Sequence, residues 1–203
     1  MNKTGAQLTG EWPKFRYIIH NFSPKLRISI RAASRKNAVL VLREVKKGIR
    51  EQSPGGQKFQ PLNDLTVREK ASVKGIGSVK SNSALIRYGD LLKAFEYSVD
   101  EKNGSFWVGI QKGKKNRSGT DLNMIARTMN YGMTVTVTPS LRNYFAATGR
   151  PLKKETTHLD IPARPFIEPV LKALQPIIIK NYIDAIDRVL KGKKGIGEVI
   201  NND

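Results

Sequence analysis

The 203-residue sequence contains no cysteine and only two histidines, His20 and His158. The absence of cysteine excludes disulfides, thiolate metal sites and a cysteine nucleophile, and it is compatible with a reducing cytosol. Zinc and copper sites usually need more imidazole or thiolate ligands than two separated histidines supply. Neither histidine stands in a recognisable catalytic motif, so we interpret both as ordinary surface or partly buried residues. The sequence therefore predicts a protein that is not an enzyme and that binds no metal or cofactor.

Long apolar runs are also missing. The longest apolar cluster, Pro176-Ile177-Ile178-Ile179, is far shorter than the roughly 20 residues that span a bilayer. Residues 1–12 are polar and lack the apolar stretch of a secretory signal. With 39% hydrophobic and 26% charged residues, the composition is that of an ordinary folded domain. We therefore expect a folded protein without a membrane partner.

Acidic residues are few. The chain has 17 Asp and Glu against 36 Lys and Arg, which gives a net charge of +19 and a pI near 10.2. Such an excess favours contact with nucleic acid or with an acidic protein surface, and by itself it does not choose between them. Aromatic residues make up 7% and are not interleaved with the basic clusters, as base-stacking platforms would be. Two basic clusters stand out, namely Arg27, Arg31, Arg35 and Lys36, and then Lys112, Lys114, Lys115 and Arg117.

The second cluster lies in a basic loop, residues 112–120, that contains glycines. Its like charges predict mobility in the isolated subunit, with ordering only when a partner binds. The segment Gly113 to Gly119 superficially resembles a phosphate-binding loop. However, five residues rather than four separate the glycines, and no lysine follows Gly119. We therefore expect this loop to contact a partner and not a nucleotide.

Hydrophobic spacing predicts two long helices. From Ser34 onward one apolar stripe has helical spacing, and Ser53-Pro54-Gly55-Gly56 ends that helix. Ser23-Pro24 is typical of a helix start, but the alternation of Leu26, Ile28 and Ile30 leaves a short strand there as an alternative. In the last helix Pro176 should kink or interrupt the pattern. The first stripe is Ala38, Leu42, Val45 and Ile49, and the second is Leu171, Leu174, Ile178, Tyr182, Ala185 and Val189.

Between the long helices the sequence predicts short elements. Asn103-Gly104 indicates a hairpin turn into a strand over 106–110, and the β-branched run 134–138 indicates another strand. A short helix over 121–131 ends at Gly132, residues 139–149 are either a turn or a helical insertion, and residues 156–162 are extended. The predicted class is α+β, a small mixed or antiparallel sheet packed by two long helices, with extended loops. We place an N-terminal arm at 1–22, a single domain at 23–192 and a flexible tail at 193–203.

Several short phrases fall in an order that resembles the virion-morphogenesis or tail-completion family of tailed bacteriophages, a family typified by phage Mu G-like proteins. The resemblance covers roughly residues 34 to 190, and Pro162 to Phe166 is its most specific phrase. The sequence departs from the family at Met129-Asn130, where the family often has His-Glu. The matching phrases are Gly55-Gly56, Phe59-Gln60-Pro61-Leu62, Thr66 with Lys70, Leu85 to Leu91 with Ser98, Trp107-Val108-Gly109, Ile125-Ala126 before Asn130-Tyr131-Gly132, and Ile161 to Phe166.

The resemblance implies a structural virion protein, a neck or tail-completion protein that joins the head to the tail. It implies that copies of the chain assemble as a ring around the DNA channel, with six-fold symmetry favoured and twelve-fold as the alternative. Its partners would be neighbouring neck, connector or tail proteins, with nonspecific contact to packaged DNA. The protein would be made in the host cytoplasm and reside in the virion, at the head-tail junction or upper tail. The charge alone supports a different class, a nonspecific basic nucleic-acid-binding protein.

The phrase Ile161 to Phe166 also has a physical interpretation of its own. Pro162 and Pro165 force an extended approach to the last helix and place Phe166 as an anchor. Arg164 between them has a planar fork that suits a carboxylate, either in the same subunit or in a neighbouring one. The predicted partner interface therefore consists of Arg164, Phe166, Lys112, Lys114, Lys115 and Arg117, and no catalytic, cofactor-binding or metal-binding residue is predicted.

Overall fold

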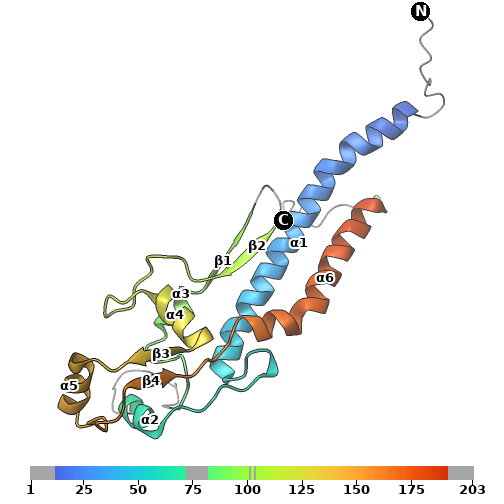
Figure 1. Ribbon diagram of the computed structural model, residues 1–203. Helices are drawn as coiled ribbons and strands as arrows, with labels where there is room; N and C mark the ends of the chain where they lie inside the picture. The colour runs from blue at the N-terminus through green and yellow to red at the C-terminus, as the bar shows by residue number, and fades with distance from the viewer. Residues whose placement is uncertain (1–11, 72–81, 101, 103, 192–203) are drawn as a thin grey trace, which may run out of the picture. The chain divides into compact units, whose positions relative to one another are not determined.

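The computed structural model describes residues 12–71, 82–100, 102 and 104–191, with the side chains of residues 12–23, 65 and 69 left outside that description. Long helices and two small antiparallel two-stranded sheets make an α+β fold, as the sequence predicts (Figure 1). The elements in chain order are α1 (Trp12–Glu51), the short 3-10 helix η1 (Pro54–Gly56), α2 (Asp64–Ala71), α3 (Asp90–Ala94), β1 (Glu96–Val99), β2 (Phe106–Gly109), α4 (Leu122–Tyr131), β3 (Met133–Thr136), α5 (Pro139–Ala147), β4 (His158–Ile161) and α6 (Glu168–Leu190).

The described residues cluster into two compact units. Unit 1 takes them from 1–39, 98–107 and 175–203, and unit 2 from 40–97 and 108–174. Helices α1 and α6 and the β1–β2 hairpin contribute residues to both units. The domain limits inferred from the sequence stay a prediction. Of the predicted N-terminal arm, residues 12–22 belong to the same helix as residues 23–51. Residues 1–11 of the arm and the predicted tail, 193–203, lie outside the described part.

Helix α1 begins at Trp12, so Ser23-Pro24 is not its start and the alternative strand at Leu26 to Ile30 is wrong. A proline inside a helix costs about 3 kcal/mol because it removes one backbone hydrogen bond and crowds the preceding turn. Tertiary packing of one helix face outweighs such a local cost. Here Ser29, Ala33 and Asn37, spaced four residues apart, are fully buried, whereas Ile28 is exposed. The spacing of these small and polar residues, and not the alternation of large ones, marks the inner face.

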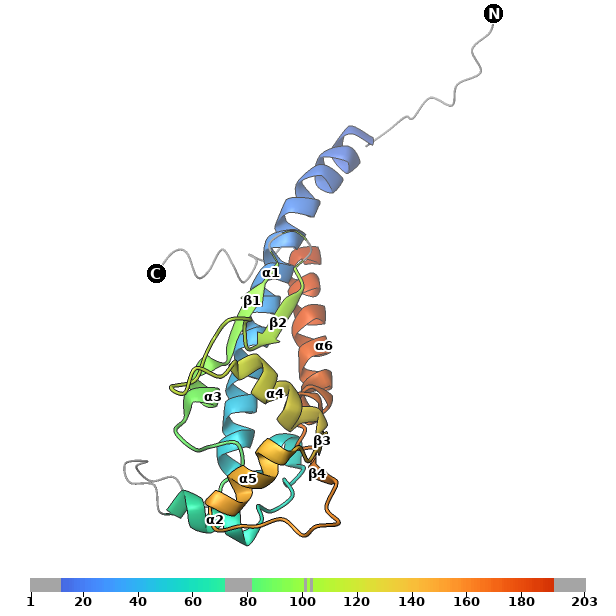
Figure 2. The ribbon, with the colours of Figure 1, turned by 60° about the vertical axis from the view of Figure 1, so that its left-hand side comes forward.

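In unit 1, α1 and α6 lie side by side (Figures 1 and 2) and meet through polar contacts. The side-chain amide of Asn181 donates to Asn37 Oδ1 at 2.6 Å, and Ser29 Oγ donates to the Ala185 carbonyl at 2.9 Å. The hairpin turn also packs on α1, because a Cβ added at Gly104 would come 2.9 Å from Ile30. Close approach of the two helices thus depends on small and polar residues that a search for apolar stripes overlooks.

The predicted face of α6 is only partly right. Ala185 and Val189 are buried, but Leu171 is 38% exposed and the neighbouring Val170 is buried in its place. Pro176 lies inside α6 without ending it. The inward face therefore starts one residue earlier than the apolar pattern suggests.

Unit 2 contains the C-terminal part of α1, whose predicted stripe is confirmed in that Val45 and Ile49 are fully buried. The strand pair β3–β4 is antiparallel, with Met133 opposite Ile161 and Thr136 opposite His158. The predicted helix 121–131 is confirmed as α4, since the Asp121 carboxylate accepts from the backbone amides at its start and Gly132 (φ 75°) ends it. The segment after β3 is helical and forms α5. Among the described residues, no helix is both long and apolar enough to cross a membrane.

Candidate functional site

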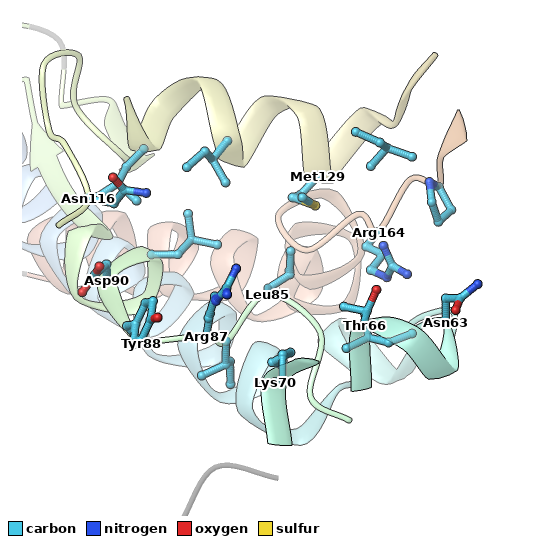
Figure 3. Close-up of a pocket in the computed structure, with 18 of the residues that line it drawn as sticks. Asn63, Thr66, Lys70, Leu85, Arg87, Tyr88, Asp90, Asn116, Met129 and Arg164 are labelled. Carbon is cyan, nitrogen blue, oxygen red and sulfur yellow. The ribbon is translucent and has the colours of Figure 1, made fainter. Parts of the chain in front are cut away.

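Unit 2 contains a cavity of about 1000 Å³ (Figure 3). Its walls come from α2, the 85–91 segment, α4, and the end of β4 with the residues that follow it. Figure 3 shows α4 with Met129 on one side and α2 with Thr66 and Lys70 on the other. Much of the lining is apolar, and it comprises Leu62, Leu85, Ile86, Leu91, Leu122, Ile125, Met129 and Ile161. Such an apolar hollow with a few polar groups at its edge is the usual form of a binding site.

Arg164 closes one end of this cavity from inside the subunit. It is 6% exposed; its Nε donates to the Gln60 carbonyl at 3.2 Å and its Nη2 donates to the Pro61 carbonyl at 3.3 Å. Its backbone amide donates to the Met129 carbonyl at 2.7 Å. Burial lowers the pKa of the guanidinium from its usual value, yet arginine stays protonated in proteins. The fork therefore joins two consecutive carbonyls of the 60–61 segment to the start of the last helix.

Phe166 is likewise an interior residue. It is 1% exposed, and its ring packs edge-on against Phe95 with 5.6 Å between centroids. Its backbone amide donates to Asn130 Oδ1 at 3.1 Å. Asn130, which in sequence is only a departure from the family pattern, thus caps the segment that carries Phe166. In the sequence, the available signal was an asparagine two residues before the glycine that ends the predicted helix.

The prediction that Arg164 and Phe166 belong to a partner interface is corrected by their burial. The two prolines hold the 162–166 segment extended, and in extended chain alternate side chains point to the same side. Because residues 164 and 166 share that side, both enter the interior, whereas Ala163 is exposed. The carboxylate expected for Arg164 is replaced by backbone carbonyls. These residues position the cavity wall; they are not the surface that a neighbour would touch.

The basic loop, residues 112–120, makes several contacts within unit 2, and the mobility that its charges predict stays a prediction. Asn116 Oδ1 accepts from the Ser118 and Thr120 amides, each at 2.9 Å. Arg117 pairs with Asp90 at 3.3 Å, and its guanidinium carbon lies 4.3 Å from the Tyr88 ring centroid. Part of the loop's positive charge is neutralised by ion pairs inside the subunit, such as that between Arg117 and Asp90, which reduces the repulsion between its like charges.

The remaining predicted basic residues differ in their surroundings. Lys114 pairs with Glu96, whereas Lys112 and Lys115 are exposed. None of Lys112, Lys114, Lys115 and Arg117 lines the large cavity, although Asn116 and Ser118 of the same loop do. The first basic cluster lies on the unit 1 part of α1, where Arg27, Arg35 and Lys36 are exposed. The structure therefore brings Arg164 and two polar residues of the loop, Asn116 and Ser118, to one cavity but leaves the loop's lysines and Arg117 outside its lining.

Lys70, which the sequence indicates only as part of a family-like phrase and not as a site residue, lines the cavity. Its ammonium donates to the Ser83 carbonyl. Burial, and then the positive charge of Arg87, lower the pKa of Lys70 from its usual value. The edge of an apolar cavity thus carries two cations, Lys70 and Arg87, and that charge suits an anionic group on a bound molecule.

The histidines and acidic residues form no metal site in the described part of the chain, where no three His, Asp or Glu side chains come together. His158 is exposed on β4, with its Nδ1 at 2.9 Å from Thr157 Oγ1. His20 lies in α1, and its side chain is outside the description.

Comparison of the chain with protein-family models, with curated proteins and with solved structures finds no match. The contacts of unit 2 and the order of its phrases are therefore the basis for assigning a function.

Proposed function

We propose that the chain is a structural virion protein of a tailed bacteriophage, a neck or tail-completion protein that joins the head to the tail as a ring around the DNA channel. The supporting observation is that several of the phrases which resemble the family contact one another in unit 2. Arg164 bonds to residues 60 and 61, and Asn130 bonds to Phe166. A Cβ added at Gly55 would come 2.3 Å from the Pro169 carbonyl oxygen, so Gly55 packs against the start of α6.

Direct contact between the phrases strengthens the resemblance. Residues 60 and 164 are 104 positions apart in sequence, and chance matches to short phrases would be scattered over the fold. Phrases that a family retains for folding would instead touch one another, as these do. The contacts between the phrases then help to define the fold, and the surface around them is free to suit a particular neighbour.

The ring is tested by imaging the purified protein in negative stain, beside a DNA-binding titration over a range of salt concentrations. We expect closed rings, and weak DNA binding that falls with salt through nonspecific phosphate contacts. The alternative, a basic nucleic-acid-binding protein, predicts particles without rings, with tight binding to DNA of any sequence. Monomers that coat DNA would refute the neck assignment.

Within this proposal, the cavity of unit 2 is a contact site for a neighbouring neck or tail protein. Its apolar wall suits a large apolar side chain, and Lys70 and Arg87 at its edge suit an adjacent carboxylate. The excess of basic residues in the whole chain favours an acidic partner in the same way. The expected occupant is therefore an acidic segment that carries an apolar anchor.

Ile125→Trp tests this contact because Ile125 lines the cavity from α4. The larger ring should occupy part of the space at the apolar wall and hinder entry of the partner's anchor, weakening the contact by about 2 kcal/mol or more, a typical loss for a central anchor. In complementation of a phage that lacks this gene, we expect tailless heads and free tails. The matched control is Met124→Trp on the same helix, because Met124 is 60% exposed and outside the cavity.

Circular dichroism should show both tryptophan variants folded. Equal, normal yields of joined particles from Ile125→Trp and Met124→Trp would remove the cavity from the interface. A failure of Met124→Trp alone would move the interface to the outer face of α4.

A further inference from the structure

Within unit 1, α6 carries a line of large apolar side chains that α1 does not cover. Their exposed fractions are 48% for Ile179, 58% for Ile183, 37% for Ile186 and 65% for Leu190. Steps of four, three and four residues place them along one stripe of the helix. The face that packs on α1 is a different one, which includes Asn181 and Ala185. We call the exposed line the α6 seam.

The α6 seam has the spacing by which helices pair. Single exposed apolar residues are common on proteins, but four in a line at steps of three and four are the pattern of a coiled-coil contact. Burying such a side chain stabilises an interface by about 1.5–3 kcal/mol relative to leaving it in water. In unit 1 this pattern is continuous over three helical turns. The seam is therefore suited to another helix of the same kind.

The charges beside the seam identify that helix. Lys180 and Asp187 stand seven residues apart on the same flank of the seam, and Asp187 Oδ2 also accepts from Lys191 Nζ at 2.5 Å on its own helix. If a second α6 lies antiparallel, with Ile183 opposite Ile186 of the partner subunit, then Lys180 faces Asp187 of the partner subunit. The two-fold axis repeats that pair. In a parallel arrangement, residues on one flank face the opposite flank of the other helix, and these two charges do not meet.

We propose that the α6 seam pairs in antiparallel fashion with the α6 seam of a second copy of this chain, about a two-fold axis between Ile183 and Ile186. The apolar line supplies the affinity, and the flanking ion pairs, which are exposed, mainly set the orientation. This contact is separate from the proposed ring, because a closed ring of identical subunits uses head-to-tail contacts between two different surfaces. A two-fold contact instead uses one surface twice.

Sedimentation equilibrium of the full chain measures the pairing. Ile183→Glu places two carboxylates in the centre of the seam, and we expect the dimer to weaken by about a hundredfold or more. The fold should survive, because Ile183 is exposed. The matched control is Arg188→Glu on the same helix, since Arg188 is exposed and lies away from the seam. A wild-type protein that stays monomeric at about 0.1 mM, or a dimer unchanged by Ile183→Glu, would overturn the proposal.

Exchanging the flanking charges tests the orientation. Lys180→Asp alone, or Asp187→Lys alone, brings like charges together twice in each dimer and should weaken it. The double variant restores opposite charges and should recover most of the lost affinity. If the double variant instead lost as much dimer affinity as the two single variants together, the antiparallel register would be excluded.

The absence of native cysteine permits a direct distance test. Under mild oxidation, mixing Ile183→Cys protein with Ile186→Cys protein should give a cross-linked heterodimer, because the two positions face each other beside the axis. Leu190→Cys alone should not cross-link, because in the antiparallel pair its two copies stand about 16.5 Å apart along the helices, from 11 residues at 1.5 Å each. Mixing Leu190→Cys protein with Ile179→Cys protein should give the cross-linked heterodimer. Self-linking of Leu190→Cys would indicate a parallel pair, and the absence of any seam cross-link would indicate a different contact; both results refute the proposal.

Ile183→Glu also tells apart the seam pairing proposed here and the ring contact proposed above. Rings of Ile183→Glu protein that form without two-fold dimers would support both contacts. Wild-type rings without two-fold dimers would overturn the seam pairing and leave the ring intact.

Discussion

Arg164→Met should lower the free energy of unfolding by about 3 kcal/mol, because two backbone carbonyls lose a charged donor and a hydrogen bond to a charged group is worth about 1.5–3 kcal/mol. The guanidinium is 6% exposed and joins the Gln60 and Pro61 carbonyls to the segment before α6. Methionine keeps most of the side-chain volume, so the loss reports the hydrogen bonds more than the packing. Chemical denaturation followed by circular dichroism measures the change.

Two variants calibrate that loss. Arg164→Lys keeps the charge but not the planar fork, so its stability should fall between the wild type and Arg164→Met. Lys153→Met removes a cation from an exposed position and should change stability by less than about 0.5 kcal/mol. If Arg164→Met were no more destabilising than Lys153→Met, the hydrogen bonds from Arg164 to residues 60 and 61 would contribute nothing to the free energy of unfolding.

Phe166→Ala should be more destabilising still, by about 4 kcal/mol, because removal of a fully buried aromatic ring leaves a cavity that its surroundings fill only in part. Phe166 is 1% exposed, and Phe95 would lose its edge-on partner. The backbone bond to Asn130 Oδ1 does not depend on the side chain, so the loss measures packing. Thermal and chemical unfolding of the purified variant give the value.

Tyr131→Ala is the matched control for Phe166→Ala. It also removes an aromatic ring, close to Asn130 in sequence, but Tyr131 is 73% exposed and should cost less than about 0.5 kcal/mol. A similar loss in both variants would contradict the placement of Phe166 in the core of unit 2.

These expected losses change how variants of the 162–166 segment should be understood. From the sequence, Arg164→Glu would leave the subunit folded and block head-tail joining through a lost intersubunit pair. In the structure the new carboxylate would face two carbonyl oxygens at a position that is only 6% exposed, and like partial charges repel there. Failure of joining by Arg164→Glu would therefore report unfolding of unit 2. The cavity variant Ile125→Trp tests the interface without that ambiguity.

Local features of the fold were predictable because their causes lie within a few residues of one another. The Ser53 to Gly56 stop follows from proline and glycine chemistry, and α4 follows from an acidic cap at its start and a glycine at its end. The β-branched run that became β3 and the stripe that buries Val45 and Ile49 follow from side-chain spacing. The α+β class came from these local patterns.

What the sequence by itself determined is thus the α+β class, several of the local elements, the basic charge and the order of the family-like phrases. Only the tertiary structure decided which groups meet: Arg164 with carbonyls 104 residues away, Asn37 with Asn181, and the basic loop with Asp90 and Tyr88. It also decided that α1 passes through Pro24 and that the α6 seam faces outward. The physical reason is that a partner for a charge or an apolar face is set by the path of the whole chain, and nothing in the neighbouring residues encodes that path.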